Sequence, residues 1–280
     1  MSHHFRAFSF VDRIASVEPG VRASGSYAIP AGLEAFSSSL VAESTGQLAA
    51  WSAMAGIDFG ARPVAGIAGL VEILGPVMPG DTLQIEVKID SMEADAIAYG
   101  GTASVKGQPV LRLEHCVGPM LPSEDFDDLA AMRERYALLC GDGAEAGAFG
   151  GVSGLALENP DVVGGQSAHA TLQVPEDAPF FADHFPLRPV FPGSLLMQLN
   201  LELVGRLAGE LELPAGASGW NLHTISNMKL RTFIPRGERL EVEASLLESS
   251  GDELTISVES RSGKRRVGIA TVLLGTEAPA

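Results

Sequence analysis

The sequence has few cysteines and few basic residues. Only two cysteines occur in 280 residues, too few for a disulfide framework, and this number fits a reducing cytoplasm. Lysine and arginine together number 19 against 35 aspartate and glutamate residues, which gives a formal net charge of −16. Nucleic acids and anionic membranes attract a basic surface, so the composition argues against both as partners.

The sequence also lacks the motifs of several common types of site. No small-residue cleavage site follows an apolar core near the N-terminus, and every long apolar run carries a charged or amide residue, so we expect neither a secretory leader nor a membrane span. No two histidines or cysteines have metal-ligand spacing, and neither a glycine-rich phosphate loop nor a nucleophile elbow is present. We therefore predict a cytoplasmic protein that uses no metal or other cofactor.

What the sequence does contain is an internal repeat. The segment GDTLQIE at 80–86 resembles GERLEVE at 237–243, an offset of 237 − 80 = 157 residues. Two long apolar segments, 38–55 and 193–209, lie at a similar offset, and each reads as a helix that lacks a polar face. Such a helix needs cover on all sides, which a sheet curled round it provides. Each half therefore predicts a strand, a buried helix and an antiparallel meander.

A histidine-containing loop precedes the second apolar helix. Residues 180–193 read FFADHFPLRPVFPG, and His184 lies there among aromatic and apolar residues. Pro192 and Gly193 follow, a pair that suits the start of a helix, where a glycine lets a ligand approach the free backbone N–H groups. The loop therefore places a titratable base near a helix terminus that can stabilise negative charge.

These residues resemble a known family. The segment DHFPLRPVFPGSLLMQ is similar to the His-Phe-Pro-x-Arg-Pro-Val-x-Pro-Gly motif of hotdog-fold 3-hydroxyacyl-acyl-carrier-protein dehydratases. FSFVDRIASVEPG resembles their N-terminal segment, and GPVMPGD resembles their mid-sheet turn. The resemblance implies an α+β double hotdog, with two antiparallel sheets each wrapped round a long central helix to form a covalent pseudo-dimer. We expect an N-terminal hotdog domain at 1–121, a helical linker at 122–150 and a C-terminal hotdog domain at 151–280.

In that family the active site lies between two hotdog units. One unit supplies a histidine, and the central helix of the other supplies a Glu or Asp fourteen residues after its own histidine position. Here that position, 184 + 14 = 198, is Gln198, so the second half has the base but lacks the acid. In the first half, LVAESTGQ places Glu43 at the acid position and Gln47 one turn later.

The first half in turn lacks the histidine loop. The interval from Gly20 to Glu43 is 43 − 20 = 23 residues, whereas the matching interval from Gly165 to Gln198 is 198 − 165 = 33. We therefore predict one composite site, in which His184 and Glu43 are catalytic. By resemblance, Gln47 orients Glu43, and the Gly193 N–H binds the thioester carbonyl. We assign no chemistry to the other histidines, His3, His4, His115, His169 and His223.

The implied reaction is dehydration of an acyl-carrier-protein-linked 3-hydroxyacyl thioester to the trans-2-enoyl thioester, in fatty-acid or polyketide biosynthesis. A neutral imidazole suits removal of the weakly acidic C2 proton, and a carboxylic acid kept protonated by an apolar setting suits protonation of the leaving hydroxyl. Glu43, among Leu40, Val41 and Leu48, fits such a setting.

Three alternatives stay open. An enoyl-thioester hydratase acting on coenzyme A substrates uses the same residues, whereas a thioesterase is less favoured because the motif is that of the dehydratases. A catalytically silent acyl-binding protein is the third. The expected partner is an acyl carrier protein or an acyl-CoA, and a homodimer of double hotdogs is left open. Carrier proteins are acidic like this chain, so binding needs a local basic patch, for which the candidates are Arg188, Arg206, Lys229, Arg231 and Arg236.

Overall fold

The computed structural model describes residues 5–276, so His3 and His4 lie outside the described range. The strands and helices of the first half are β1 (Arg13–Glu18), β2 (Arg22–Ala28), α1 (Ser38–Gly56), β3 (Ala61–Pro63), β4 (Ile67–Ile73), β5 (Thr82–Met92), β6 (Ala96–Val105), β7 (Gln108–Pro122), the 3-10 turn η1 (Ser123–Asp125) and α2 (Leu129–Cys140). Those of the second half are β8 (Glu158–Val163), β9 (Ser167–Gln173), the 3-10 turn η2 (Pro179–Ala182), α3 (Gly193–Gly209), β10 (Asn221–Leu230), β11 (Arg239–Ser250), β12 (Glu253–Ser262) and β13 (Arg265–Gly275).

The two halves have the same strand order. From the outer edge to the middle of the molecule, the first half runs β1-β2-β5-β6-β7-β4 and the second runs β8-β9-β11-β12-β13-β10. The repeat found in the sequence has a direct structural counterpart, because β5 and β11 begin 239 − 82 = 157 residues apart. The predicted internal repeat is therefore a repeat of topology as well as of sequence.

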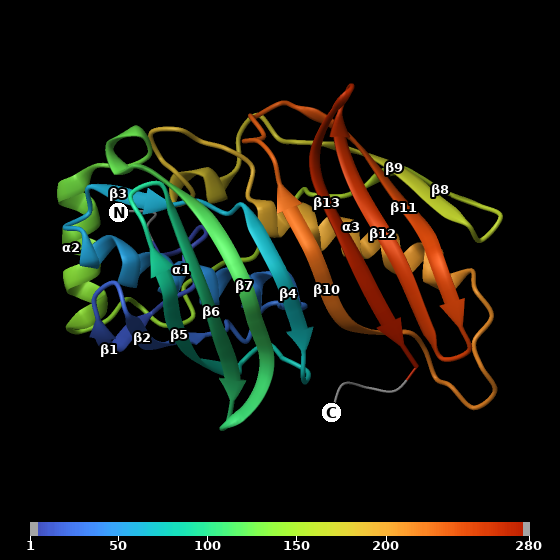
Figure 1. The fold of residues 1–280 in the computed structure, drawn as a ribbon, viewed down its shortest axis with the longest axis horizontal. Coiled ribbons are helices and arrows are strands. Elements are labelled where there is room, and N and C mark those ends of the chain that lie inside the picture. The colour runs from blue at the N-terminus through green and yellow to red at the C-terminus, as the bar shows by residue number, and fades with distance from the viewer. Residues whose placement is uncertain (1–4, 277–280) are drawn as a thin grey trace.

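The two predicted antiparallel sheets are joined edge to edge into one continuous sheet. The innermost strands β4 and β10 pair with each other, with Thr224 opposite Glu72 and Lys229 opposite Ile67. An unpaired edge strand leaves a row of backbone N–H and C=O groups without partners, and this pairing removes one such edge from each half. Figure 1 shows the two strands side by side at the centre of the molecule.

Both long helices lie on the same side of this sheet. In Figure 1 α1 runs behind the strands of the first half and α3 behind those of the second. The inward-facing side chains of the strands form a core with both helices; in β5, for example, every second residue from Leu83 to Ile89 is buried. The helices also contact each other, which brings residues of the two halves together beneath the sheet.

Helix α1 is buried although its sequence contains several hydroxyl groups. The Ser44 and Thr45 hydroxyls donate to the Val41 carbonyl at 2.7 and 3.1 Å, so these buried polar groups are satisfied within the helix itself. Strand β6 accommodates the helix by having a glycine: a Cβ on Gly101 would lie 2.6 Å from Thr45 Cγ2. Gly101 thus marks close packing of the helix against this strand.

Within the segment predicted as a helical linker, 122–150, the α-helix α2 spans only 129–140. Strand β7 extends to Pro122, a 3-10 turn follows, and α2 begins only after Asp128, whose carboxylate accepts a hydrogen bond from the Ala131 N–H at 2.8 Å. The acidic N-cap is thus Asp128, the last of several acidic residues in the segment. Among the described residues, no helix combines the length and apolar character needed to cross a membrane.

Candidate active site

A cavity of about 780 Å³ lies between the two halves, under the β4–β10 junction. Its wall includes residues of α1, the 180–193 loop, the first turn of α3, and strands β4, β7 and β10. All four residues singled out from the sequence, Glu43, Gln47, His184 and Gly193, line this one cavity. Glu43 and His184 lie 184 − 43 = 141 residues apart in the sequence. The contact between α1 and α3 brings them to the same cavity.

Glu43 lies in the second turn of α1 and its side chain faces the cavity. Its carboxyl Oε1 accepts a hydrogen bond from Gln47 Nε2 at 3.0 Å. Burial raises the pKa of Glu43, and this effect outweighs the opposing influence of Gln47, Ser194 and the Arg62 charge. The surface that Glu43 leaves accessible borders the cavity, so the carboxyl is shielded from bulk water. A carboxyl in this setting can hold a proton to deliver to a ligand.

Gln47 is held in one orientation by the N-terminal segment. Its Nε2 also donates to the Phe8 carbonyl at 3.1 Å, and its Oε1 accepts from the Phe10 N–H at 2.8 Å. Both ends of the amide are therefore occupied, which leaves the Nε2 donor directed at Glu43. The Gln47 amide is thus fixed by its hydrogen bonds, and it holds the Glu43 carboxyl in one orientation.

His184 presents one ring nitrogen to the cavity. Its Nδ1 lies 3.0 Å from the Val190 carbonyl, and because a carbonyl only accepts, Nδ1 carries the hydrogen. The neutral ring then has its lone pair on Nε2. Burial, aided by the Arg62 charge, lowers the pKa of His184 to about 4 against the opposing influence of the Val190 carbonyl and Asp183. The imidazole is therefore a neutral base at physiological pH.

The N-terminal segment joins the two parts of the site. The Ala7 and Phe8 N–H groups donate to Asp183 Oδ2 at 3.1 and 3.0 Å, next to His184 in the loop. The Phe8 ring meets the His184 ring edge-on, with centroids 5.5 Å apart. The same short segment also binds Gln47, so it links the base of one half to the acid of the other. Sequence reasoning missed this function of Asp183, whose only signal was its place in the motif.

Gly193 begins α3, preceded by Pro192, which has no side-chain donor or acceptor for the helix end. The N–H groups of the first turn have no intrahelical acceptor, so they are available to a ligand oxygen. The need for glycine arises from packing: a Cβ at this position would lie 2.2 Å from Leu230 Cδ1. The close contact is thus with β10 of the same half, and ligand approach to the Gly193 N–H stays a prediction.

The residue of α3 that corresponds to Glu43 in the internal repeat has a different environment. Gln198 lies on α3, and its Oε1 accepts a hydrogen bond from the Ser37 hydroxyl at 3.0 Å. The preceding loop of the first half, between β2 and α1, spans 9 residues (29–37), whereas the loop between β9 and α3 spans 19 (174–192). The shorter loop contains no histidine. This position therefore has an amide in place of the acid, and its loop supplies no histidine.

Part of the chain is similar in sequence to known proteins. Residues 161–267 match the family model described as ApeI-like, ApeI dehydratase. A Shewanella oneidensis protein described as 3-hydroxyacyl-[acyl-carrier-protein] dehydratase FabZ is 29% identical over 91 residues, which cover 31% of this chain and 59% of that protein. The protein of the same description from Shewanella loihica is 28% identical over 90 residues, with the same coverage. The chain thus matches little more than half the length of these relatives.

Over these residues the chain is similar to proteins described as dehydratases. Two solved structures extend the likeness to both halves at the level of fold. A putative oleoyl thioesterase from Lactobacillus plantarum has a TM-score of 0.59 and 11% identity, covering 91% of this chain and 96% of its own. A MaoC-like dehydratase has a TM-score of 0.57 and 14% identity, covering 92% and 98%. The predicted α+β hotdog architecture is confirmed.

Proposed function

We propose that this hotdog protein dehydrates a 3-hydroxyacyl thioester to the trans-2-enoyl thioester at one composite site. The observation that carries the proposal is that two groups from opposite halves of the chain line the same cavity: an imidazole whose pKa burial lowers to about 4, and a carboxyl whose pKa burial raises. The two hotdog units would comprise residues 1–121 and 151–280, with 122–150 as the linker. The sequence match to dehydratases supports the reaction type.

The two residues divide the chemistry. His184 Nε2 removes the C2 proton, and the electron pair of the C2–H bond forms the C2–C3 double bond as the C3–O bond breaks. Glu43 gives its proton to the departing hydroxyl, so that water leaves, and the imidazolium then returns a proton to the carboxylate. General acid and base groups of this kind each contribute about 10²- to 10⁴-fold. The same steps in reverse hydrate an enoyl thioester.

The other two residues would support these steps. Charge develops on the thioester oxygen as C2 loses its proton, and the Gly193 N–H at the start of α3 would stabilise it, a contribution of about 3 kcal/mol for a well-placed donor. Gln47 keeps the Glu43 carboxyl in position through the hydrogen bond at 3.0 Å. The acyl chain would lie along the apolar wall of the cavity, which includes Val71, Ile97 and Leu113.

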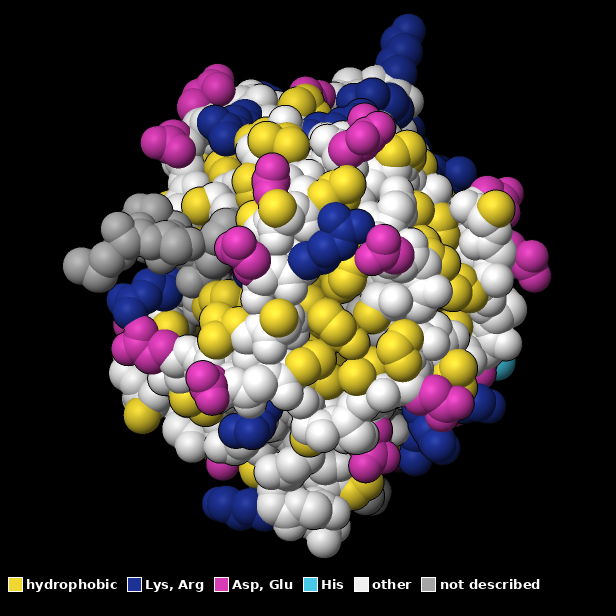
Figure 2. Space-filling view, turned by 90° about the vertical axis from the view of Figure 1, so that its left-hand side faces the viewer, with side chains coloured by type: hydrophobic (Ala, Val, Ile, Leu, Met, Phe, Trp, Pro, Cys, Tyr) yellow, Lys and Arg dark blue, Asp and Glu magenta, His cyan; other side chains and the backbone are white. Residues whose placement is uncertain are grey.

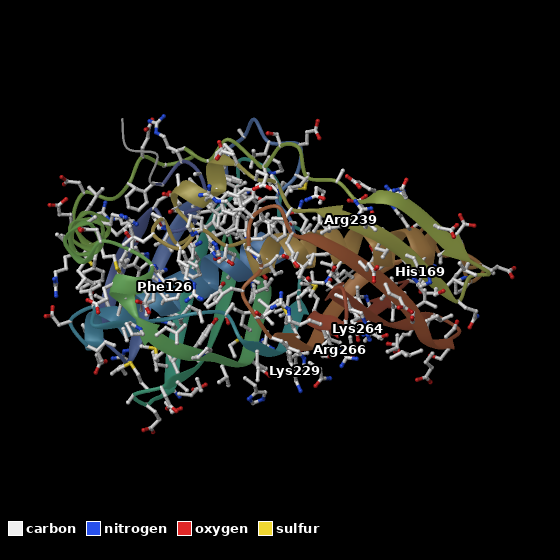
Figure 3. All side chains as sticks on the ribbon, turned by 90° about the horizontal axis from the view of Figure 1, so that it is seen from above. Phe126, His169, Lys229, Arg239, Lys264 and Arg266 are labelled. Atoms are coloured by element: carbon white, nitrogen blue, oxygen red, sulfur yellow. The ribbon has the colours of Figure 1, made fainter. Side chains whose placement is uncertain are left out.

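The thioester carrier would be an acyl carrier protein or coenzyme A, within fatty-acid or polyketide biosynthesis. Lys229 and Arg231 both line the cavity and are exposed, which makes them suitable contacts for a phosphate-bearing pantetheine arm. Figure 3 shows Lys229 on the same side of the molecule as Lys264 and Arg266. By contrast, Figure 2 shows a face on which acidic and basic side chains are interspersed round a group of hydrophobic ones.

The test is to incubate the purified chain with 3-hydroxybutyryl thioesters of coenzyme A and of an acyl carrier protein. Enoyl thioester formation and free thiol release are followed in parallel, and crotonyl thioesters are used for the reverse reaction. The proposal expects enoyl formation without thiol release. Thiol release would instead identify a thioesterase, and tight binding without turnover would identify a silent acyl-binding protein.

A further inference from the structure

Arg62, on the short strand β3, lies in the wall of the same cavity. Its guanidinium carbon is 4.3 Å from the centroid of the Phe185 ring, and that ring stacks against His184 with centroids 4.3 Å apart. The Arg62 charge also reaches both proposed catalytic groups, since it lowers the pKa of Glu43 and of His184. A fixed positive charge therefore stands beside the reacting pair.

The guanidinium of Arg62 has too few acceptors. Its side chain is 15% exposed, and its contact with Asp127 Oδ2, at 3.9 Å, is an ion pair too long for a hydrogen bond. The carboxylate of Asp127 is already engaged, because it accepts from Arg135 Nη1 and Nη2 at 3.1 and 2.9 Å. Arg62 Nε is fully buried without a hydrogen-bond partner, and among the described residues none accepts a hydrogen bond from this side chain.

The charges of Arg62, Arg135 and Asp127 also indicate that an acceptor is missing. Arg62 and Arg135 share one carboxylate, Asp127, so the cluster retains a net charge of +1. Glu43 does not neutralise this charge when it is protonated, as its raised pKa favours. A buried guanidinium is costly unless it is paired and hydrogen-bonded, and Arg62 borders a cavity large enough to admit a partner.

We propose that Arg62 binds an oxygen acceptor, a carbonyl or a carboxylate, on the thioester that occupies the cavity. This inference rests on the proposed function in so far as the ligand is an acyl thioester. The acceptor has two sources: an amide carbonyl of the pantetheine arm, or a polar group on the acyl chain itself. Arg62 is thereby a determinant of which thioesters bind, separate from the acid and the base.

The experiment measures binding of saturated acyl thioesters, which lack the 3-hydroxyl group and cannot be dehydrated. Four ligands form a two-by-two set: butyryl and glutaryl chains, each as the S-ethyl and the pantetheine thioester. Their dissociation constants are measured by calorimetry for the wild type and for Arg62→Met. We expect the substitution to weaken only the ligands that carry the Arg62 acceptor, by about 10- to 100-fold, as for a hydrogen bond to a charged group.

The pattern of losses identifies the source of the acceptor. A loss confined to both pantetheine thioesters assigns it to the arm, and a loss confined to both glutaryl ligands assigns it to the acyl chain. Equal weakening of all four ligands, or no weakening of any, would overturn the proposal, because a packing defect has no preference among them. Binding here does not depend on turnover, so an inactive protein that binds selectively would refute the proposed reaction and leave this inference standing.

Two further variants keep the test decisive. Arg62→Lys retains the charge with a single donor head, and we expect it to preserve the ligand preference at reduced strength even if Arg62→Met folds poorly. Arg133→Met is the matched control, since Arg133 also lies over an aromatic ring, 5.9 Å from the centroid of Phe59, but does not line the cavity. Its dissociation constants should equal those of the wild type for all four ligands.

Discussion

The two halves share one strand order but differ at corresponding positions of their central helices. On α1, Glu43 faces the cavity and accepts a hydrogen bond from Gln47 at 3.0 Å. On α3 the corresponding residue is Gln198, which is bonded to Ser37 at 3.0 Å. The loops before the helices differ as well, with 19 residues before α3 and 9 before α1. One half contains an acid without a histidine loop, and the other a histidine loop without an acid.

This difference teaches how a duplicated fold can retain a single site. Two symmetric sites would each need a loop and an acid, but a single site needs only one of each, provided that they come from opposite halves. The contact between α1 and α3 brings Glu43 and His184 to one cavity. The first half lacks the histidine loop and the second half lacks the acid. Both absences fall at the position that is pseudo-symmetric to the Glu43–His184 cavity.

The largest expected effect is that of removing the base. His184→Ala should reduce kcat/KM for dehydration by at least about a hundredfold, because the C2 proton then has no acceptor. His169→Ala is the matched control, since His169 lies on β9 and Figure 3 shows it at the far end of the second half. Circular dichroism verifies that both variants fold. Near-wild-type turnover in a folded His184→Ala protein would remove this residue from the mechanism.

Removing the acid tests the contribution of the first half to the site. Glu43→Gln should likewise cost at least about a hundredfold in kcat/KM while leaving the Gln47 contact nearly isosteric. Adding Gln198→Glu to this variant should not restore activity, because the loop at 29–37 supplies no histidine to the second position. Recovery of turnover by the double variant, measured in the same assay, would show that the two halves are more alike than the structure indicates.

The pH profile sharpens the division of functions. The mechanism needs His184 neutral and Glu43 protonated. Since burial lowers the pKa of His184 to about 4, kcat/KM should fall about tenfold per pH unit only below that value. On the alkaline side it should fall as pH rises through the raised pKa of Glu43. In Glu43→Gln the residual activity should lose the alkaline limb, and an unchanged limb there would assign it to another group.

The smallest effects are expected at the pseudo-symmetric position. Ser37→Ala removes the hydrogen bond to Gln198, which should lower the free energy of unfolding by about 1 kcal/mol or less. The turnover of this variant should stay within about twofold of the wild type. Urea denaturation and the dehydration assay measure the two quantities. A large loss of turnover with intact stability would reveal a catalytic function at this position.

The sequence was sufficient to predict the two central helices, and the four candidate residues that it singled out line one cavity. The first buried helix, predicted at 38–55, spans 38–56, and the second has the predicted bounds 193–209. These predictions worked because periodicity and turn residues are local signals. Glu43 and His184 could be paired in advance because the family resemblance supplied the relation between the two halves.

Long-range contacts could not be predicted in this way. Pairing of β4 with β10 depends on two edges that lie far apart in the chain, and neither edge carries a sequence signal for its partner. Arg62 gave no local pattern, and the motif that contains Asp183 did not reveal its function. Their significance comes from an unsatisfied guanidinium and from the hydrogen bonds with Ala7 and Phe8. Such features become visible only when burial and partners are known.

The most direct test of a single composite site is a double-mutant cycle. The dehydration rates of wild type, His184→Ala, Glu43→Gln and the doubly substituted chain are measured with one 3-hydroxyacyl thioester. If both residues serve one site, each single substitution should abolish at least about 99% of the rate, and the double variant should lose little more than the worse single one. Two single variants that each retain about half of the wild-type rate, with a double variant that retains none, would contradict the account, because that pattern requires two independent sites.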